Sequence, residues 1–321
     1  MTKALTTTKR RALNVYAKNA AKYARQSKAE NTARAYRAAW NEFTAFCARH
    51  KQQPLPADAS TVVNYLADLA EAGSKVSTIT VKRAAISFAH RAAKQTDPTC
   101  AEDVRLVMAG IVKEHGRPPQ KKAPLTLDDL RRLIAALPDS LAGKRDRALI
   151  LVGWAGAFRR SELVALDVGD VRLNGELKVT VKRSKTDQEG AGMVKVIPTL
   201  ADKTLCPVTA LRAWLDAAGI QSGPVFRQMD KWGHVREHRL TPQSVALLVK
   251  ARAADAGLDP RQFAGHSLRS GFITTAAVAG VESRDIMAVT GHKSEAVMRS
   301  YIQDAGLGAK RAISAAFGEG Q

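Results

Sequence analysis

The chain has 321 residues, of which 45% are hydrophobic, and a formal net charge of +20 at pH 7. This length allows two domains with packed cores, and the hydrophobic content excludes an intrinsically disordered protein. The positive charge is uneven, because residues 1–123 hold 22 Lys and Arg against 9 Asp and Glu, whereas residues 124–321 hold 28 against 21. A basic excess on folded domains favours a polyanionic partner, most simply a nucleic acid, over a merely soluble basic protein.

The three cysteines, Cys47, Cys100 and Cys206, are widely spaced and form no Cys-x-x-Cys pair. This pattern argues against a disulfide framework and a structural zinc site, and it fits a reducing compartment. The basic N-terminus is not followed by an apolar signal core, and no apolar run reaches the ~18 residues typical of a membrane span. We therefore expect a cytoplasmic protein that needs no metal or other cofactor.

A basic segment, residues 1–28, precedes four stretches with helical periodicity. We expect this segment to be an N-terminal arm, either a helix from about Ala12 or a flexible contact to phosphates. In each of the four stretches the apolar residues recur on one helical face, which predicts an all-helical domain over residues 29–115. The predicted helices lie at about 31–47, 60–72, 79–93 and 101–114.

The third predicted helix has a polar and basic face. Its apolar face would hold Val81 and Phe88, and its opposite face would show Arg83 and His90, with Lys82 at the edge. A helix with such an outer face fits a DNA major groove, so Lys82 and Arg83 are candidate DNA contacts. The alternative is an ordinary solvated basic face.

Residues 116–124 combine prolines with basic residues and offer almost nothing apolar to bury, so we expect an interdomain linker. Lys121 and Lys122 of this linker are candidate contacts to a phosphate backbone. In the second domain, Gln243 and Lys250 lie in a predicted helix that begins at Pro242, and they are further candidates for DNA contact.

Residues 125–321 predict a larger α+β domain. Thr126, followed by acidic residues, predicts a helix start, and the apolar run Ala148–Ala157 predicts a buried helix that ends at the Phe158–Arg159 corner. Two alternating runs, 177–182 and 193–197, predict a β-hairpin whose turn holds Lys185. Further helices are predicted at 207–218, 242–256, 268–279, 283–290 and 309–317.

Four separate blocks of the second domain carry side chains that suit phosphodiester chemistry. Cleavage of a phosphodiester without a metal needs a nucleophile, cations on the non-bridging oxygens and an acid for the leaving oxygen. Each residue alone has a structural alternative, such as a core histidine or a solvated turn lysine, but the order and spacing of the whole set favour catalysis. The set is Arg159 with Glu162, Lys185, His266 with Arg269, and His292 with Tyr301.

Each block suits a different part of this reaction. Tyr301 can attack the phosphorus and form a phosphotyrosyl ester, and Lys185, on a hairpin tip, suits a proton donor to the leaving 5′-oxygen. His266 and His292 can share proton transfer and hydrogen bonding to the developing charge.

The two arginines suit the phosphate oxygens. Arg159 and Arg269 carry the planar fork that matches two phosphate oxygens better than a lysine does. Glu162, about one helical turn after Arg159, can orient that arginine or His266.

With these residues in this order, the chain from about Thr32 to Tyr301 resembles a tyrosine recombinase of the phage integrase family. The resemblance implies a mainly α-helical protein, with an N-terminal SAM-like core-binding bundle and a catalytic domain of the DNA breaking-rejoining fold that has a small antiparallel sheet. The size is similar to that of the Cre and Xer recombinases, without an extra arm-binding domain. Ala157 departs from the family pattern, which commonly has glycine there, and Arg160 stands where an apolar residue is common.

The resemblance also implies an activity and its partners. It implies site-specific recombination through a 3′-phosphotyrosyl intermediate and a Holliday junction, on double-stranded DNA with inverted-repeat sites. A homotetramer would form on DNA through the last helix, and an accessory directionality factor is an open option. Such a protein would be encoded by a bacterium, a phage or a mobile element.

Three rival functions stay open at this point. A type IB topoisomerase or a telomere resolvase would use the same chemistry without exchanging partners, but the helical first domain and the length favour a recombinase. A DNA-binding relative that lacks the chemistry is disfavoured by the complete residue set. A ribosome-associated or RNA-binding protein would show no preference for inverted-repeat duplexes.

Overall fold

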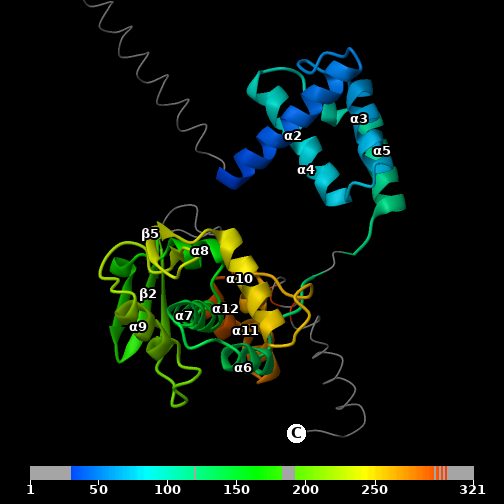
Figure 1. The fold of residues 1–321 in the computed structure, drawn as a ribbon. Helices are drawn as coiled ribbons and strands as arrows, with labels where there is room; N and C mark the ends of the chain where they lie inside the picture. The colour runs from blue at the N-terminus through cyan, green and yellow to red at the C-terminus, as the bar shows by residue number, and fades with distance from the viewer. Residues whose placement is uncertain are drawn as a thin grey trace, which may run out of the picture. The chain divides into compact units, whose positions relative to one another are not determined.

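The computed structural model describes residues 30–118, 121–182 and 192–292, together with Ser294, Glu295, Met298 and Tyr301. The chain divides into two compact units, Met1–Pro119 and Gln120–Gln321, which are described separately here (Figure 1). The predicted N-terminal arm and the predicted last helix, residues 309–317, lie outside the described residues. Within the described ranges no helix is long and apolar enough to cross a membrane.

The first unit is helical wherever it is regular, as the sequence predicts. α2 packs against α4, and α3 packs against α5. Phe43, Leu66, Ile86 and Val104, one from each α-helix, are fully buried in a common core. The elements are α2 (Glu30–Arg49), α3 (Ala59–Glu71), α4 (Val76–Ala92), the 3-10 turn η1 (Pro98–Cys100) and α5 (Glu102–His115).

The predicted orientation of α4 is wrong. Val81 and Phe88 are 43% and 39% exposed, whereas His90 is fully buried. The reason is that both ring nitrogens of His90 are satisfied: Nε2 accepts from the Ala57 N–H at 2.9 Å, and Nδ1 donates to the Ile86 carbonyl at 2.9 Å. A histidine satisfied in this way is stable in a core, which a polarity pattern does not reveal.

The rotation of α4 also affects its two candidate DNA contacts. Lys82 forms an ion pair with Glu42, and only 13% of its side chain is exposed. Arg83 is half-buried. In this conformation the charge of Lys82 is therefore already engaged within the first unit.

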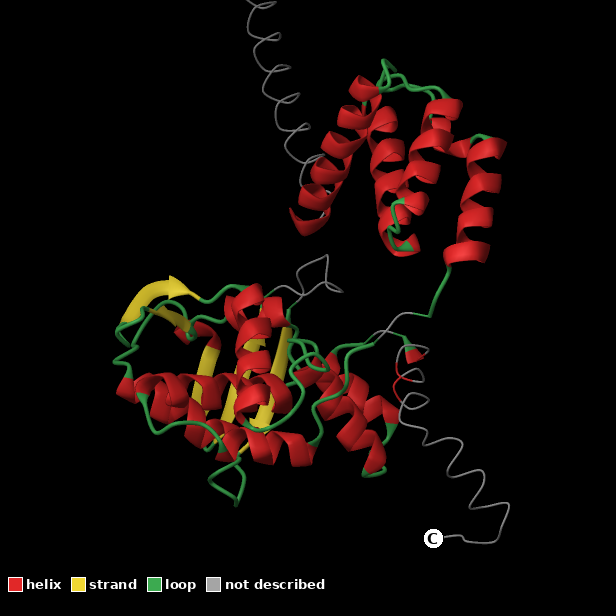
Figure 2. Cartoon of the chain, turned by 45° about the vertical axis from the view of Figure 1, so that its right-hand side comes forward, coloured by secondary structure: helices red, strands yellow, loops and turns green. Residues whose placement is uncertain are grey.

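The second unit combines helices with two small antiparallel sheets, drawn in red and yellow in Figure 2. Its core contains α7, whose residues Ala148–Val152 are all buried and which packs against α9 and α11. The elements are α6 (Leu127–Ala135), α7 (Leu141–Ala155), α8 (Arg160–Ala165), the 3-10 turn η2 (Val168–Asp170), β1 (Val171–Asn174), β2 (Glu176–Val181), β3 (Met193–Pro198), α9 (Pro207–Ala217), β4 (Arg227–Met229), β5 (Val235–Arg239), α10 (Pro242–Asp255), α11 (Ser267–Val278) and α12 (Ser283–Thr290).

The larger sheet has the strand order β1-β2-β3 and contains the predicted hairpin. β2 and β3 pair in antiparallel fashion with Val179 opposite Lys195, which confirms the hairpin prediction. β1 and the separate β4–β5 pair are not predicted, because strands of four, three and five residues are too short to display a clear alternation. The predicted cap is present, since the Thr126 side chain accepts from the Asp129 N–H.

Candidate active site

The corner between α7 and α8 places Arg159. Ala157 adopts a left-handed backbone conformation with φ of 46°, and Phe158 is buried behind it. Gly156 is required here, because a Cβ at this position would lie 2.2 Å from the Phe158 ring. The chain thus stops α7, turns sharply and starts α8 with Arg159 at its N-terminal edge.

Glu162 fixes the orientation of Arg159. Its carboxylate accepts from Arg159 Nη1 at 2.6 Å and from the Arg159 backbone N–H at 3.0 Å. Glu162 is buried, and Arg159 is half-buried. One carboxylate therefore holds both the backbone and the guanidinium of this arginine, and the remaining guanidinium donors are available for an anion.

Arg269 is a buried arginine on the first turn of α11, with 1% of its surface exposed. Its Nη1 donates to the Ala157 carbonyl at 2.6 Å, and its Nη2 donates to His292 Nε2 at 2.9 Å. Burial, followed by the positive charge of Arg159, lowers the pKa of Arg269 to about 10. The guanidinium still carries its charge at neutral pH, next to that of Arg159.

The tautomer of His292 follows from these bonds. An arginine can only donate, so His292 Nε2 accepts and Nδ1 carries the proton. Nδ1 then donates to Thr290 Oγ1 at 3.0 Å. Desolvation, followed by the charges of Arg269 and Arg159, lowers the pKa of His292 to about 4, so the ring is neutral at pH 7. Gly291, in a left-handed conformation with φ of 70°, ends α12 just before this histidine.

Tyr301 lies beside His266. Its hydroxyl oxygen is 2.9 Å from His266 Nε2, and its ring centroid is 6.0 Å from that of His292. Partial desolvation, followed by the charge of Arg269, lowers the pKa of His266, which favours a neutral ring that can accept the phenol proton. The tyrosine also packs against the small apolar cluster that contains Ile273 and Met298.

Two polar residues of this region are missing from the sequence-based candidate set, Thr290 and Lys195. Thr290 is buried and contacts His292, but a threonine at the end of a helix gives no local signal of that contact. Lys195 is buried on β3, and its amine donates to the Gly156 carbonyl at 2.8 Å. A signal for it does exist, because the alternation of β3 places Lys195 on the same face as Met193 and Ile197.

The structure brings six of the candidate residues together, namely Arg159, Glu162, His266, Arg269, His292 and Tyr301. Lys185 lies outside the described residues. Gln243 and Lys250 are exposed on α10, seven residues apart. Lys122 donates to the Arg261 carbonyl at 2.6 Å, so this linker residue contacts the loop before α11.

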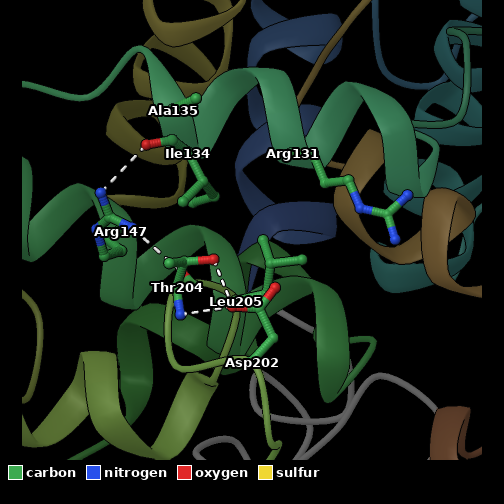
Figure 3. Close-up of a pocket in the computed structure, with 7 residues that line it drawn as sticks. All are labelled: Arg131, Ile134, Ala135, Arg147, Asp202, Thr204 and Leu205. Carbon is green, nitrogen blue, oxygen red and sulfur yellow. Dashed lines mark hydrogen bonds between the residues drawn. The ribbon is translucent and has the colours of Figure 1, made fainter.

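A pocket of about 350 Å³ lies between α6, α7 and the loop before α9, and Figure 3 shows its lining. It contains none of the candidate residues. Its polar groups bond to one another or to a neighbour: Arg147 donates to the carbonyls of Thr204 and Ile134, Asp202 accepts from Thr204, and Arg131 donates to Asp128. These contacts account for its lining as local structure. Among the described residues, no three His, Cys, Asp or Glu side chains gather as a metal site.

Comparison with known sequences gives consistent matches. A sequence model of the phage integrase family matches residues 123–306, more than half of the chain. An integrase/recombinase xerD homolog of Selenomonas ruminantium is 40% identical over 288 residues, which cover 88% of this chain and 84% of that protein. Recombinase cre of Escherichia phage P1 is 23% identical over 300 residues, which cover 87% of this chain and 86% of that protein.

Solved structures share the fold. XerH site-specific recombinase bound to a palindromic difH substrate has a TM-score of 0.60 at 17% identity, and the match covers 80% of this chain and 72% of that chain. A lambda integrase dimer bound to a COC′ core site has a TM-score of 0.59 at 18% identity, covering 90% and 75%. Fold, residue set and sequence matches together define a tyrosine recombinase. The chain belongs to the phage integrase family.

Proposed function

We propose that this chain cleaves and rejoins DNA by attack of Tyr301 on a phosphodiester. The observation that carries the proposal is the 2.9 Å hydrogen bond between the Tyr301 hydroxyl and His266, next to two arginines. Arg159, Arg269 and the nearby Lys195 bring three positive charges, against the carboxylate of Glu162. This excess suits a phosphate, whose non-bridging oxygens gain charge as the attack proceeds.

The proposed step accounts for each bond that forms or breaks and for each proton that moves. The Tyr301 oxygen bonds to phosphorus while its proton passes to His266, and the bond from phosphorus to the 5′-oxygen breaks. We assign the proton for the leaving 5′-oxygen to Lys185, in the hairpin between β2 and β3. The product is a 3′-phosphotyrosyl ester and a free 5′-hydroxyl. Because the ester conserves the bond energy, attack by a 5′-hydroxyl reseals the strand and releases Tyr301, without ATP or a metal.

Strand exchange between two sites completes the proposed activity. The net charge of +20 suits double-stranded DNA, and the DNA of the structurally similar XerH complex is a palindrome. We propose inverted-repeat sites, a Holliday junction intermediate and a homotetramer that forms on DNA through the last predicted helix. A directionality factor would then set the balance between integration and excision.

The test is covalent capture on a nicked suicide duplex that carries the inverted repeats flanking the gene. Loss of the small fragment after cleavage prevents religation and traps the ester. On a denaturing gel without added metal, the wild type should give a covalent protein–DNA band. Tyr301→Phe and Arg269→Ala should bind DNA without giving the band.

Tyr65→Phe is the matched control, because Tyr65 lies in the core of the first unit and its hydroxyl has no hydrogen-bond partner there. This variant should form the covalent band like the wild type. DNA binding without any covalent species in the wild type would refute the proposed chemistry. Relaxation of supercoils without a site preference would instead indicate a topoisomerase.

A further inference from the structure

Lys195 is a buried cation to which the proposed reaction assigns no bond-making or proton-transfer step. It lies on the inner face of β3 and is 4% exposed, whereas its neighbours Val194 and Val196 point outward and are 60% and 49% exposed. Lysine is almost never fully buried unless its ammonium is paired, because desolvation of a charge is costly. Its position therefore calls for specific partners.

The partners of Lys195 are backbone carbonyls and an aromatic ring. The amine donates to the Gly156 carbonyl at 2.8 Å and to the Val289 carbonyl. It also lies 5.1 Å from the centre of the Phe158 ring, in a cation–π arrangement. Neither hydrogen bond reaches a side chain that could react with DNA, so Lys195 is placed to act through the segments that it holds.

Those segments carry the candidate catalytic residues. Gly156 and Phe158 form the corner that ends with Arg159, and Val289 precedes His292 by three residues at the end of α12. β3 itself continues from the hairpin that contains Lys185. The ammonium of Lys195 therefore connects β3 with two other segments, whose bonded residues lie 39 and 94 residues away from it in sequence.

Electrostatic contacts link the same groups. Desolvation lowers the pKa of Lys195 to about 8, Glu162 opposes this shift, and Arg269 and Arg159 reinforce it. The charge of Lys195 in turn contributes to the low pKa of His292. Lys195 therefore interacts with the candidate active-site residues electrostatically, in addition to its hydrogen bonds to the backbone.

We propose that Lys195 is a positioning residue of this active site, which fixes the Arg159 corner and the end of α12 at the separation at which Arg159 and His292 reach one phosphate. The proposal rests on the function proposed above. It gives β3 a role beyond supporting the hairpin. If the role of Lys195 were only structural, its removal would lower the stability of the protein, but the active-site geometry of the molecules that still fold would stay intact.

The kinetic test compares Lys195→Met with the wild type in single-turnover covalent capture. Methionine keeps the chain length and removes the charge and the donors. The rate of covalent complex formation should fall by roughly tenfold to a hundredfold, since small misplacements of catalytic groups have effects of this order. DNA affinity should stay within about twofold, because Lys195 is buried. Lys195→Arg, which keeps the charge and both donors, should recover part of the rate.

Lys178→Met is the matched control. Lys178 lies on the neighbouring strand β2, is exposed and pairs with Glu176 at 3.0 Å. Its replacement removes the same charge from the same sheet without touching the Arg159 corner, so covalent capture should proceed as in the wild type. Equal losses of rate in Lys178→Met and Lys195→Met would refute a specific role for Lys195.

A second measurement does not depend on cleavage. NMR titration of the His292 imidazole in the free protein should give a pKa near 4 for the wild type and a higher one for Lys195→Met, because the charge of Lys195 is one of the groups that lower it. A wild type that forms no covalent complex would refute the proposed function, whereas this titration would still decide the role of Lys195.

Thermal unfolding identifies variants that fail to fold. If Lys195→Met does not fold, Lys195→Gln, which keeps one donor without the charge, undergoes both measurements with the same expected directions. A folded variant that cleaves within about twofold of the wild-type rate overturns the proposal. The proposal is also overturned if the His292 pKa is unchanged in the variant and the loss of cleavage rate equals the fraction of the variant that is unfolded.

Discussion

At the scale of single residues, Thr290 completes the hydrogen bonding that holds the His292 ring in one tautomer. Arg269 donates to Nε2, which leaves the proton on Nδ1, and the Thr290 hydroxyl accepts the hydrogen bond from that N–H. When a phosphate engages Arg269, Nε2 loses this donor, and it must take up a proton before it can donate to a phosphate oxygen. Partners that fix a histidine tautomer commonly contribute ten- to a hundredfold at metal sites, and we expect a similar order here.

The first prediction is that Thr290→Val slows covalent capture by roughly tenfold with little change in DNA affinity. Valine has the shape of threonine but leaves the buried Nδ1–H without an acceptor. Thr290→Ser, which keeps the hydroxyl, is the control and should retain most of the rate. A valine variant that cleaves like the wild type would show that the tautomer needs no such partner.

The second prediction concerns acid stability. The pKa of His292 is about 4 in the folded chain and about 6.5 in an unfolded one. Between these values the unfolded state binds more protons, so stability falls as the pH drops from about 6.5 towards 4. His292→Gln should therefore show a shallower decline of Tm over this window than the wild type. Parallel declines in the two proteins would contradict this contribution.

At the scale of elements, the corner between α7 and α8 carries backbone strain. Ala157 has a φ of 46°, where a Cβ costs roughly 1 kcal/mol relative to glycine. This explains in physical terms the preference for glycine that the family resemblance implies at this position. The strain is retained where the Ala157 carbonyl holds Arg269, so the corner combines an unfavourable backbone with a useful acceptor.

The third prediction follows from this strain. Ala157→Gly should raise the free energy of unfolding by up to about 0.5 kcal/mol, because relief of the left-handed strain slightly exceeds the entropy that glycine adds to the unfolded chain. Urea unfolding of the wild type and the variant measures the difference. Ala155→Gly, in the helix just before the corner, should be destabilising and serves as the opposite control. A loss of stability in Ala157→Gly would refute the strain argument.

The elements also mark the limit of prediction from sequence. The longer helices and the β2–β3 hairpin follow from periodicity, whereas the six-residue α8 is too short to be predicted in this way, and the candidate active-site residues follow from their order along the chain. The buried face of α4 does not, because a histidine bonded at both nitrogens packs like a hydrophobic residue. Lys195 and Thr290 were missed because their partners are backbone carbonyls or a histidine whose place depends on tertiary structure.

At the scale of the whole molecule, the charge of +20 sets how DNA binding depends on salt. Each phosphate that a protein neutralises contributes about −0.9 to the slope of log affinity against log salt. We expect Lys250, exposed on α10, to make one such contact. This is the fourth prediction: Lys250→Gln should flatten the slope by about 0.9. Fluorescence anisotropy between low and moderate salt measures it, and Lys203→Gln, in the loop between β3 and α9, should leave the slope unchanged.

The hydrogen bond between Tyr301 and His266 joins two groups of the same chain. We therefore expect each subunit of the proposed assembly to use its own tyrosine beside its own arginines, without a tyrosine from a neighbouring subunit. Mixing the two inactive variants Tyr301→Phe and Arg269→Ala should consequently restore no cleavage, which covalent capture on the mixed sample would measure. Restored activity would mean that the tyrosine of one subunit attacks a phosphate bound by the arginines of another. If every subunit uses its own tyrosine, we expect a damaged subunit of the proposed assembly to leave uncleaved only the strand to which it is bound.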